Sequence, residues 1–275
     1  NKGGNGNIYC APHSASKVLE IITRKYHYPT WLNNTSTKLI GDSLDINGKI
    51  TRKYSASVMA NNGKIFCAPD SDRYVLEIDT TVSPVSVQRI GIDCGSSQQK
   101  YVTMVFADTN KGGNGKIYCV PSMNADKILE IDPNYSDKDK ASKYIGNSIL
   151  NANSLPNNMI SYDKQKSKYV TSILANNGKI YCAPDKDNYV LEIDTTVSPV
   201  SFQRIGTNLD SEYNKYKTSI LANNGKIYAI PYNDNSIGNS ERQGKVLEID
   251  PNYSNKDDAT KLIGQNLIGS NKFLT

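Results

Sequence analysis

The stretch 177–184, Asn-Gly-Lys-Ile-Tyr-Cys-Ala-Pro, and the stretch 190–194, Val-Leu-Glu-Ile-Asp, decide the fold of this chain. Versions of this pair occur five times, and each copy is followed by an Ile-Gly dipeptide. The copies are 5–21, 62–79, 114–132, 177–194 and 224–250. The glycines of the Ile-Gly dipeptides are Gly41, Gly91, Gly146, Gly206 and Gly264. A period of roughly 50 residues predicts a ring of small β-sheets with one sheet per repeat.

Each repeat predicts four short antiparallel strands. In the fourth copy the expected strands are 169–175, 179–183, 189–194 and 201–205. Asn177-Gly178 is typical of a hairpin turn, because both turn residues take positive φ, and Pro184 ends the second strand by removing a backbone donor. Such a sheet buries both faces only against neighbouring sheets, so we expect an all-β fold, a β-propeller of four-stranded blades.

The repeats alternate between two types. Residues 60–91 and 175–206 match at 28 of 32 positions, whereas the third and fifth copies share Leu-Glu-Ile-Asp-Pro-Asn-Tyr-Ser, from Leu129 and Leu247. We call the second and fourth copies the even repeats and the others the odd repeats. The chain, 1–275, is expected to form one propeller domain. Its repeats are expected at about 1–52, 53–99, 100–166, 167–214 and 215–275.

The two ends of the chain resemble parts of one hairpin. Residues 1–9 match 110–118 except at Asn7, and 272–275 resemble 100–103. A C-terminal inner strand beside three N-terminal strands would close a ring of five blades, which is the expected arrangement. The alternative is part of a six- or seven-bladed propeller, because strict alternation favours an even number of blades.

The stretches 177–184 and 190–194 resemble uncharacterised propeller repeats that are loosely grouped with kelch, NHL and YncE-type proteins. The resemblance extends over nearly the whole chain, although the Gly-His and Trp-Asp marks of WD40 blades are absent and no Gly-Gly pair follows the second-strand phrase as in kelch blades. It implies the fold alone, because propellers host enzymes, lectins and scaffolds alike.

Composition excludes some classes of partner. The net charge is +5, and the lysines are spread along the chain rather than gathered in a basic run, which disfavours nucleic acid. No stretch approaches the 18 apolar residues of a membrane span. Four cysteines share one repeat position and are expected to be buried and unpaired, and Cys94 is expected to be the one exposed thiol. The four are Cys10, Cys67, Cys119 and Cys182. Unpaired cysteines slightly favour the cytoplasm, and secretion stays open.

Variable loops predict the functional face. In a propeller, the loops between second and third strands share a face with the segments that join one blade to the next. On this long-loop face the segments 41–54, 146–169 and 232–245 are long, and binding residues concentrate on loops of a rigid scaffold. The candidate binding residues here are His13, Asp70, Asp72, Arg73, Asp185, Asp187, Tyr232 and Asp234.

No catalytic residue or cofactor is expected from the motifs. The sequence contains no Gly-x-Ser-x-Gly, Walker or dinucleotide-binding pattern. The pairs Asp70/Asp72 and Asp185/Asp187 place two carboxylates one residue apart, as Ca²⁺ ligands often are, but acidic residues also favour turns, so the metal question stays open.

Two charged positions recur in every blade type. A lysine follows the Asn-Gly turn in four copies, and a glutamate occupies every third strand. The lysines are Lys64, Lys116, Lys179 and Lys226, and the glutamates are Glu20, Glu77, Glu130, Glu192 and Glu248. We expect the lysines to solubilise the hairpins, and the glutamates to be hydrogen-bonded between blades, because a buried carboxylate needs a partner.

These observations predict a non-catalytic binding or scaffold module that holds a protein partner on its long-loop face. One alternative is a glycan-binding propeller, in which tyrosines stack on sugars. A second alternative is a propeller enzyme, such as a lyase or a hydrolase, that assembles its site from the same loops.

Overall fold

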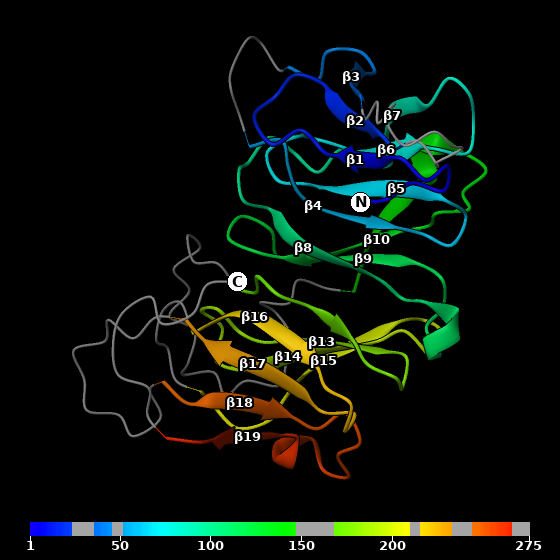
Figure 1. Ribbon diagram of the computed structural model, residues 1–275. Helices are drawn as coiled ribbons and strands as arrows, with labels where there is room; N and C mark the ends of the chain where they lie inside the picture. Colours follow the sequence, from blue (N-terminus) through cyan, green and yellow to red (C-terminus); the bar gives the residue numbers. More distant parts are fainter. Residues whose placement is uncertain (24–35, 46–51, 147–167, 210–214, 233–243, 266–275) are drawn as a thin grey trace, which may run out of the picture.

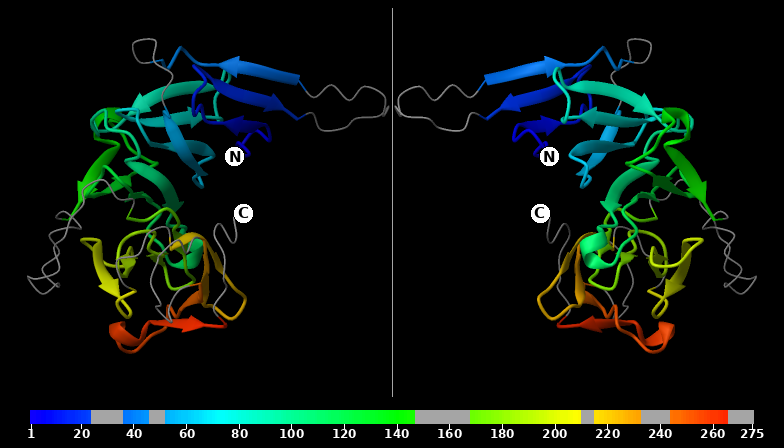
Figure 2. Two further views of the ribbon diagram at one scale, coloured as in Figure 1. Left: turned by 90° about the vertical axis from the view of Figure 1, so that its left-hand side faces the viewer. Right: turned by 90° about the vertical axis from the view of Figure 1, so that its right-hand side faces the viewer.

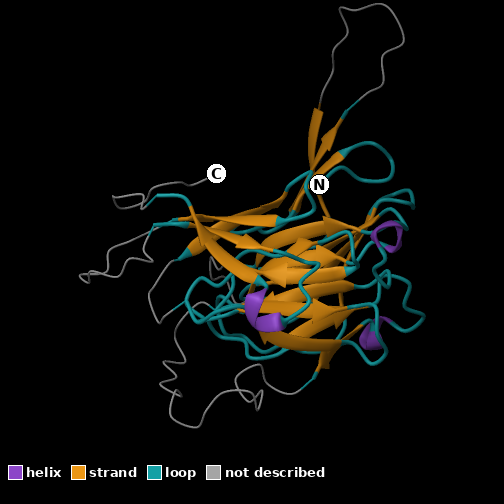
Figure 3. Cartoon of the chain, turned by 90° about the horizontal axis from the view of Figure 1, so that it is seen from below, coloured by secondary structure: helices purple, strands orange, loops and turns teal. Residues whose placement is uncertain are grey.

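The computed structural model describes the 275-residue chain except for residues 24–35, 46–51, 147–167, 210–214, 233–243 and 266–275. Strands dominate the described residues, and the helical elements among them are short 3₁₀ turns (Figure 3). These turns are η1 (Thr109–Lys111), η2 (Lys138–Lys140) and η4 (Lys256–Asp258). The expected all-β class is therefore confirmed. No helix in this part of the chain has the length and apolar character needed to cross a membrane.

The strands form five antiparallel sheets, in which each strand pairs with the next one along the chain. The first sheet contains β1 (Ile8–Cys10), β2 (Val18–Ile22) and β3 (Ser36–Ile40). The second contains β4 (Tyr54–Met59), β5 (Lys64–Pro69), β6 (Val75–Asp79) and β7 (Ser86–Ile90). The third contains β8 (Tyr101–Phe106), β9 (Ile117–Pro121), β10 (Ile128–Ile131) and β11 (Ser142–Ile145).

The last two sheets have the same order. The fourth contains β12 (Ile173–Leu174), β13 (Lys179–Cys182), β14 (Val190–Asp194) and β15 (Ser201–Ile205). The fifth contains β16 (Tyr216–Leu221), β17 (Ile227–Pro231), β18 (Val246–Ile249) and β19 (Thr260–Ile263). The five sheets follow one another along an arc, with the first and the fifth at its ends (Figures 1 and 2). Their number agrees with the five expected blades.

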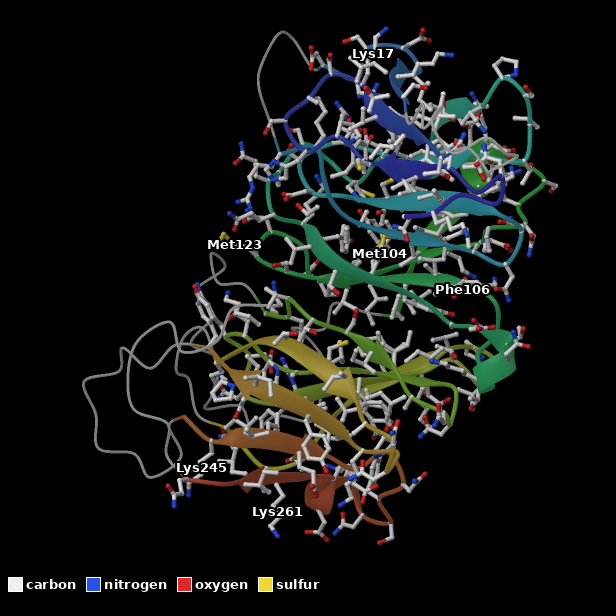
Figure 4. The ribbon with its side chains drawn as sticks, in the orientation of Figure 1. Lys17, Met104, Phe106, Met123, Lys245 and Lys261 are labelled. Carbon is white, nitrogen blue, oxygen red and sulfur yellow. The ribbon has the colours of Figure 1, made fainter. Side chains whose placement is uncertain are left out.

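Both faces of each inner sheet are buried against its neighbours. In β5, Ile65 and Cys67 pack toward the first sheet, whereas Phe66 packs toward the third, as the two-residue period of a strand requires. Each of the four core clusters lies between two consecutive sheets. Met104, labelled on β8 in Figure 4, belongs to the cluster between the second and third sheets. The prediction of sheets that are stable only in a stack is confirmed.

The first strand of the fourth sheet is shorter than expected. The sequence predicted 169–175, but β12 spans Ile173–Leu174, and Tyr169 makes only an isolated bridge to Pro184. The first strands of the second, third and fifth sheets show a register shift two residues after their start. The same irregularity therefore interrupts the ladder in every complete sheet, and an apolar pattern alone does not reveal a bulge of this kind.

The first sheet has three strands in the described part of the chain. Its β1 carries the Ile-Tyr-Cys phrase that forms the second strand in the other sheets. In place of a strand like β4, the described residues beside β1 are Asn1 and Lys2, which pair with Tyr9 and Ile8. The predicted closure would place residues 272–275 there, and these lie outside the described residues.

This difference corrects the predictions for two thiols. Cys67, Cys119 and Cys182 are fully buried, as expected, but Cys10 is exposed and Cys94 is half-buried. Cys10 is exposed because the described pairing on the inner side of β1 ends with Asn1 opposite Tyr9, one residue before Cys10.

In the native protein, we expect Cys10 to react with a thiol reagent faster than the other four cysteines. Burial raises the pKa of Cys67 to about 12 and also raises that of Cys119 and Cys182, so these groups stay protonated and unreachable. Timed labelling at pH 8 followed by peptide mass spectrometry would give the order. Cys10→Ser is the control that should remove the fast phase, and protection of Cys10 in the native protein would contradict the prediction.

The Ile-Gly dipeptides mark points where consecutive sheets touch. Gly206 has a φ of +79°, and a Cβ added there would overlap the side chain of Thr260 in the next sheet. Its amide donates to the carbonyl of Lys256 at 2.7 Å. Gly264, at the same position in the fifth sheet, has a φ of +81° and open space around it. The backbone needs glycine at both positions, but only Gly206 is also needed for contact between sheets.

Gly206→Ala should therefore destabilise the protein more than Gly264→Ala. Both variants carry the cost of a positive φ, about 1–2 kcal/mol, and only the first must also displace Thr260. Urea unfolding of the two variants measures the difference directly. Equal losses of unfolding free energy would show that the contact between sheets contributes nothing at this glycine.

Candidate functional site

One repeat position gathers four of the predicted site residues. It is the residue that follows the proline at the end of each second strand. The five residues at this position are His13, Asp70, Ser122, Asp185 and Tyr232. All lie in loops between second and third strands, on the long-loop face, which Met123 and Lys245 mark at the left of Figure 4. The structure treats this position differently in the inner sheets and in the two end sheets.

In the inner sheets the residue at this position is buried. Asp70 is fully buried, accepts a hydrogen bond from Ser55 Oγ, and accepts another from the Gln99 amide at 2.5 Å. Asp185 is also fully buried, and its Oδ2 lies 3.1 Å from Nζ of Lys217 in the next sheet. Burial raises the pKa of Asp185, and the Lys217 ammonium opposes that shift. These aspartates connect neighbouring sheets.

The second aspartate of each even repeat also has a partner within its own sheet. Nη2 of Arg89 lies 2.7 Å from Oδ2 of Asp72, whose side chain is 1% exposed. The fourth sheet repeats the pair, with Arg204 Nη2 at 2.7 Å from Asp187 Oδ2 and Arg204 Nε at 3.2 Å from Asp187 Oδ1. The two carboxylates of each Asp-x-Asp pair thus face different partners. Among the described residues, no group of three or more His, Cys, Asp or Glu side chains is arranged to hold a metal ion.

Lysines that were not among the predicted residues connect this face between sheets; Lys53 and Lys100 are buried and Lys168 is half-buried. Lys100 precedes β8, is 2% exposed, and donates to the carbonyls of Asp70, Asp72 and Ser97 at 3.0, 2.9 and 2.7 Å. Lys53 donates to the Ala15 carbonyl and Lys168 to the Ser122 and Ala125 carbonyls, each in the loop of the preceding sheet. The signal was a Lys-Tyr dipeptide just before each first strand. Its four copies begin at Lys53, Lys100, Lys168 and Lys215.

In the end sheets the same position reaches solvent. His13 is exposed, and its Nε2 lies 3.1 Å from the Nε of Arg52, which is also exposed. Tyr232 is half-buried, with the Lys217 ammonium 5.6 Å from the centre of its ring. Lys217 therefore joins two predicted residues, Asp185 and Tyr232. Lys217 was not among the predicted residues, although it departs from its counterparts in the other sheets, which are Ser55, Val102 and Val170.

The remaining predicted residues lie apart from these. Arg73 is exposed on the same face and forms an ion pair with Asp93. Asp234 lies outside the described residues. The structure thus brings Asp185 and Tyr232 together around Lys217, and it keeps His13, Asp72, Arg73 and Asp187 with separate partners.

The repeated lysines and glutamates lie on the opposite face, which we call the turn face. It carries the Asn-Gly hairpins, the turns between third and fourth strands, and η1, which is at the right of Figure 1. Each lysine forms an ion pair with the glutamate of its own sheet, a pairing that was not included in the expectation that these lysines solubilise the hairpins. The Lys–Glu distances are 3.4 Å for Lys64–Glu77, 3.1 Å for Lys116–Glu130, 3.2 Å for Lys179–Glu192 and 2.7 Å for Lys226–Glu248. A carboxylate this close neutralises each ammonium, which the hairpin sequence alone does not show.

No family model matches this sequence, and no curated protein matches it either. Solved structures do match. Virginiamycin B lyase from Staphylococcus aureus aligns with a TM-score of 0.56 at 11% identity, over 91% of this chain and 65% of the lyase. A candidate 6-phosphogluconolactonase from Bacteroides uniformis gives 0.57 at 12% identity, over 96% of this chain and 69% of that one. A Lactobacillus plantarum protein gives 0.57 at 9% identity, over 96% and 68%.

At these identities the likeness concerns the fold. Together with the five stacked antiparallel sheets, it shows that the chain has the β-propeller fold. The chain spans 65% of the length of the lyase it matches.

Proposed function

We propose that this chain is a non-catalytic binding module that holds a protein partner on its long-loop face. Its contact residues are His13 with Arg52 in the first two sheets, and Tyr232 with Lys217 in the fifth. Tyrosine and arginine are enriched among the residues that dominate protein interfaces.

One observation carries this proposal. At a single repeat position, the inner sheets bury Asp70, Ser122 and Asp185, whereas the end sheets present His13 and Tyr232 to solvent. The inner sheets have a short polar residue at this position, whereas the end sheets have residues with a ring, His13 and Tyr232. Departure from a repeat on an exposed loop is the pattern expected of a functional surface.

The proposal that the module is non-catalytic is supported by the partners of its carboxylates, which are the groups that would serve as acids or bases. Asp72 and Asp187 hold the Arg89 and Arg204 guanidiniums, and Asp70 accepts from Ser55 and the Gln99 amide. These groups are engaged in the scaffold, and a general base needs access to a substrate proton.

The test compares three immobilised proteins: the wild type, a His13→Ser/Tyr232→Ala double variant, and Val82→Ser. Val82 is 46% exposed on the turn face and serves as the matched control. We expect a protein retained by the wild type and by Val82→Ser but lost from the double variant. With that protein purified, the double variant should bind at least about tenfold more weakly, a loss of about 1.4 kcal/mol.

Identical retention by all three proteins would contradict the assigned surface. The same three proteins on a glycan array test the glycan-binding alternative. A sugar that binds the wild type and is lost with Tyr232→Ala, in the absence of any retained protein, would replace the protein partner by a glycan.

A further inference from the structure

Consecutive sheets form a groove on the turn face, and each groove is built from equivalent residues. The preceding sheet supplies a lysine, a glutamate and the fourth-strand residue that pairs with this glutamate, except that the first sheet has Asn7 in place of the lysine. The following sheet supplies the residue three positions after the aspartate that ends or follows its third strand. In the second to fifth sheets this turn residue is Val82, Tyr135, Val197 and Tyr253. Tyrosine and valine thus alternate around the arc.

A tyrosine fills the groove between the second and third sheets and the groove between the fourth and fifth sheets. The Tyr253 hydroxyl donates to Glu192 Oε2 at 2.9 Å and accepts from Gln203 Nε2 at 3.0 Å. Burial, and then Glu192, raise the pKa of Tyr253 to about 12. Tyr135 lies in the equivalent groove, 3.1 Å from Gln88 Nε2, with the Lys64 ammonium 5.7 Å from its ring centre. In these grooves a tyrosine ring lies between the two sheets, and its hydroxyl points toward the glutamate and the glutamine of the preceding sheet.

The groove between the third and fourth sheets lacks that ring. Its turn residue is Val197, which is 44% exposed, and a cavity of about 570 Å³ opens beside it. Asn114, Lys116, Glu130, Lys143, Tyr144 and Val197 are among its lining residues. The walls retain the lysine and glutamate of the filled grooves, so the cavity has the same frame without the internal ring.

One exchange makes this cavity more cationic than the filled grooves. Lys143 pairs with Glu130 in the strand register, where Gln88 pairs with Glu77 and Gln203 with Glu192. Nζ of Lys116 and Nζ of Lys143 lie 3.1 and 3.4 Å from the same oxygen of Glu130. Two ammonium groups share one carboxylate, and the Lys143 side chain is 66% exposed. Lys116 also lies 3.8 Å from Asp132, as Lys64 lies 3.0 Å from Asp79 and Lys179 lies 2.9 Å from Asp194. Lysine in place of glutamine at position 143 therefore makes this groove one charge more positive than the filled grooves.

We propose that this cavity binds an aromatic ring that carries an anionic substituent, such as a phosphate or a carboxylate. The ring occupies the place that Tyr135 and Tyr253 fill in the neighbouring grooves, against Val197, Pro199 and Val200. The anionic group meets Lys143 and Lys116, where a charge-assisted hydrogen bond is stronger than a neutral one. This site is on the turn face and does not depend on the function proposed for the long-loop face.

Calorimetric titration with phenyl phosphate, p-cresol and inorganic phosphate tests the ring and the charge separately. We expect phenyl phosphate to bind at least about tenfold more tightly than either of the others, a difference of about 1.4 kcal/mol. Val197→Tyr places a tyrosine at the position of Tyr135 and Tyr253 and should abolish this binding. Val82→Tyr makes the same change between the first and second sheets, and it should leave phenyl phosphate binding unchanged.

Lys143→Gln provides a second test on an exposed side chain, so it does not depend on how well Val197→Tyr folds. It introduces the glutamine found at the equivalent positions, Gln88 and Gln203. This variant should bind phenyl phosphate about tenfold more weakly and p-cresol with unchanged affinity. Absence of phenyl phosphate binding to the wild type would overturn the proposal. So would equal affinity for p-cresol, or binding that neither Val197→Tyr nor Lys143→Gln weakens.

Discussion

Lys100→Met should lower the free energy of unfolding by about 3–5 kcal/mol, because it leaves buried carbonyls without a donor. The ammonium of Lys100 donates to three backbone carbonyls, and two of them, Asp70 and Asp72, belong to the preceding sheet. Burial lowers the pKa of Lys100, so the scaffold maintains a charge there at a desolvation cost. Methionine keeps the length of the side chain and removes only the donor. The expected fall in Tm is roughly 10 °C.

Lys140→Met is the matched control for this experiment. Lys140 is 85% exposed and forms a surface ion pair with Asp137, so its loss should leave Tm almost unchanged. Calorimetry of the two variants beside the wild type decides the matter. If Lys100→Met melts with the wild type, the carbonyls it leaves are satisfied by water, and the lysine does not hold the two sheets together.

The sequence predicted the parts of this fold that depend on period and turn chemistry. Asn-Gly hairpins, strand-ending prolines and Ile-Gly dipeptides are local patterns, and the structure has a hairpin, a strand end and a positive φ at these places. The expectation of positive φ at both residues of the Asn-Gly turn was wrong, because Gly178 has a φ of +77° and Asn177 is not among the residues with positive φ. The buried lysines were missed although their Lys-Tyr dipeptide recurs. Lysine is almost never fully buried, and the carbonyls it meets come from another sheet, so no local pattern shows them.

The candidate site was predicted as a face and only partly as a set of residues. The loops carrying His13, Asp70, Asp185 and Tyr232 share one face, as expected. The sequence could not separate buried aspartates from exposed ring residues at the same repeat position. The partner that holds Asp185, Lys217, lies more than thirty residues away and in another sheet.

The groove residues show how two alternating sheet types became coupled. A sheet with Gln88 or Gln203 faces a following sheet with a tyrosine, whereas the sheet with Lys143 faces Val197. Glutamine can donate to a tyrosine hydroxyl, and lysine can balance a glutamate that lacks that hydroxyl. The alternation first seen as a difference between sequence copies is therefore also a physical match between neighbouring sheets. Between the third and fourth sheets, where Val197 stands in place of a tyrosine, a cavity remains.

Arg204→Met should destabilise the protein by about 3–5 kcal/mol, because it leaves the Asp187 carboxylate buried without its cation. The two side chains are 7% and 8% exposed and make two hydrogen bonds. Arg73→Met is the matched control, since Arg73 and Asp93 are 54% and 35% exposed and water can replace the lost partner. We expect no measurable change in unfolding free energy for that control.

A double variant, Arg204→Met/Asp187→Leu, separates the cost of an unpaired charge from the value of the pair. Replacing both members of a buried ion pair by apolar groups is often close to neutral, so the double variant should recover most of the stability lost by Arg204→Met. Urea unfolding of the single and double variants gives the coupling between the two positions. If Asp187→Leu adds its own loss to that of Arg204→Met, Asp187 stabilises the loop through other partners. Recovery would instead show that Asp187 is present to hold Arg204, which leaves Tyr232 and His13 as the long-loop residues that the scaffold does not require.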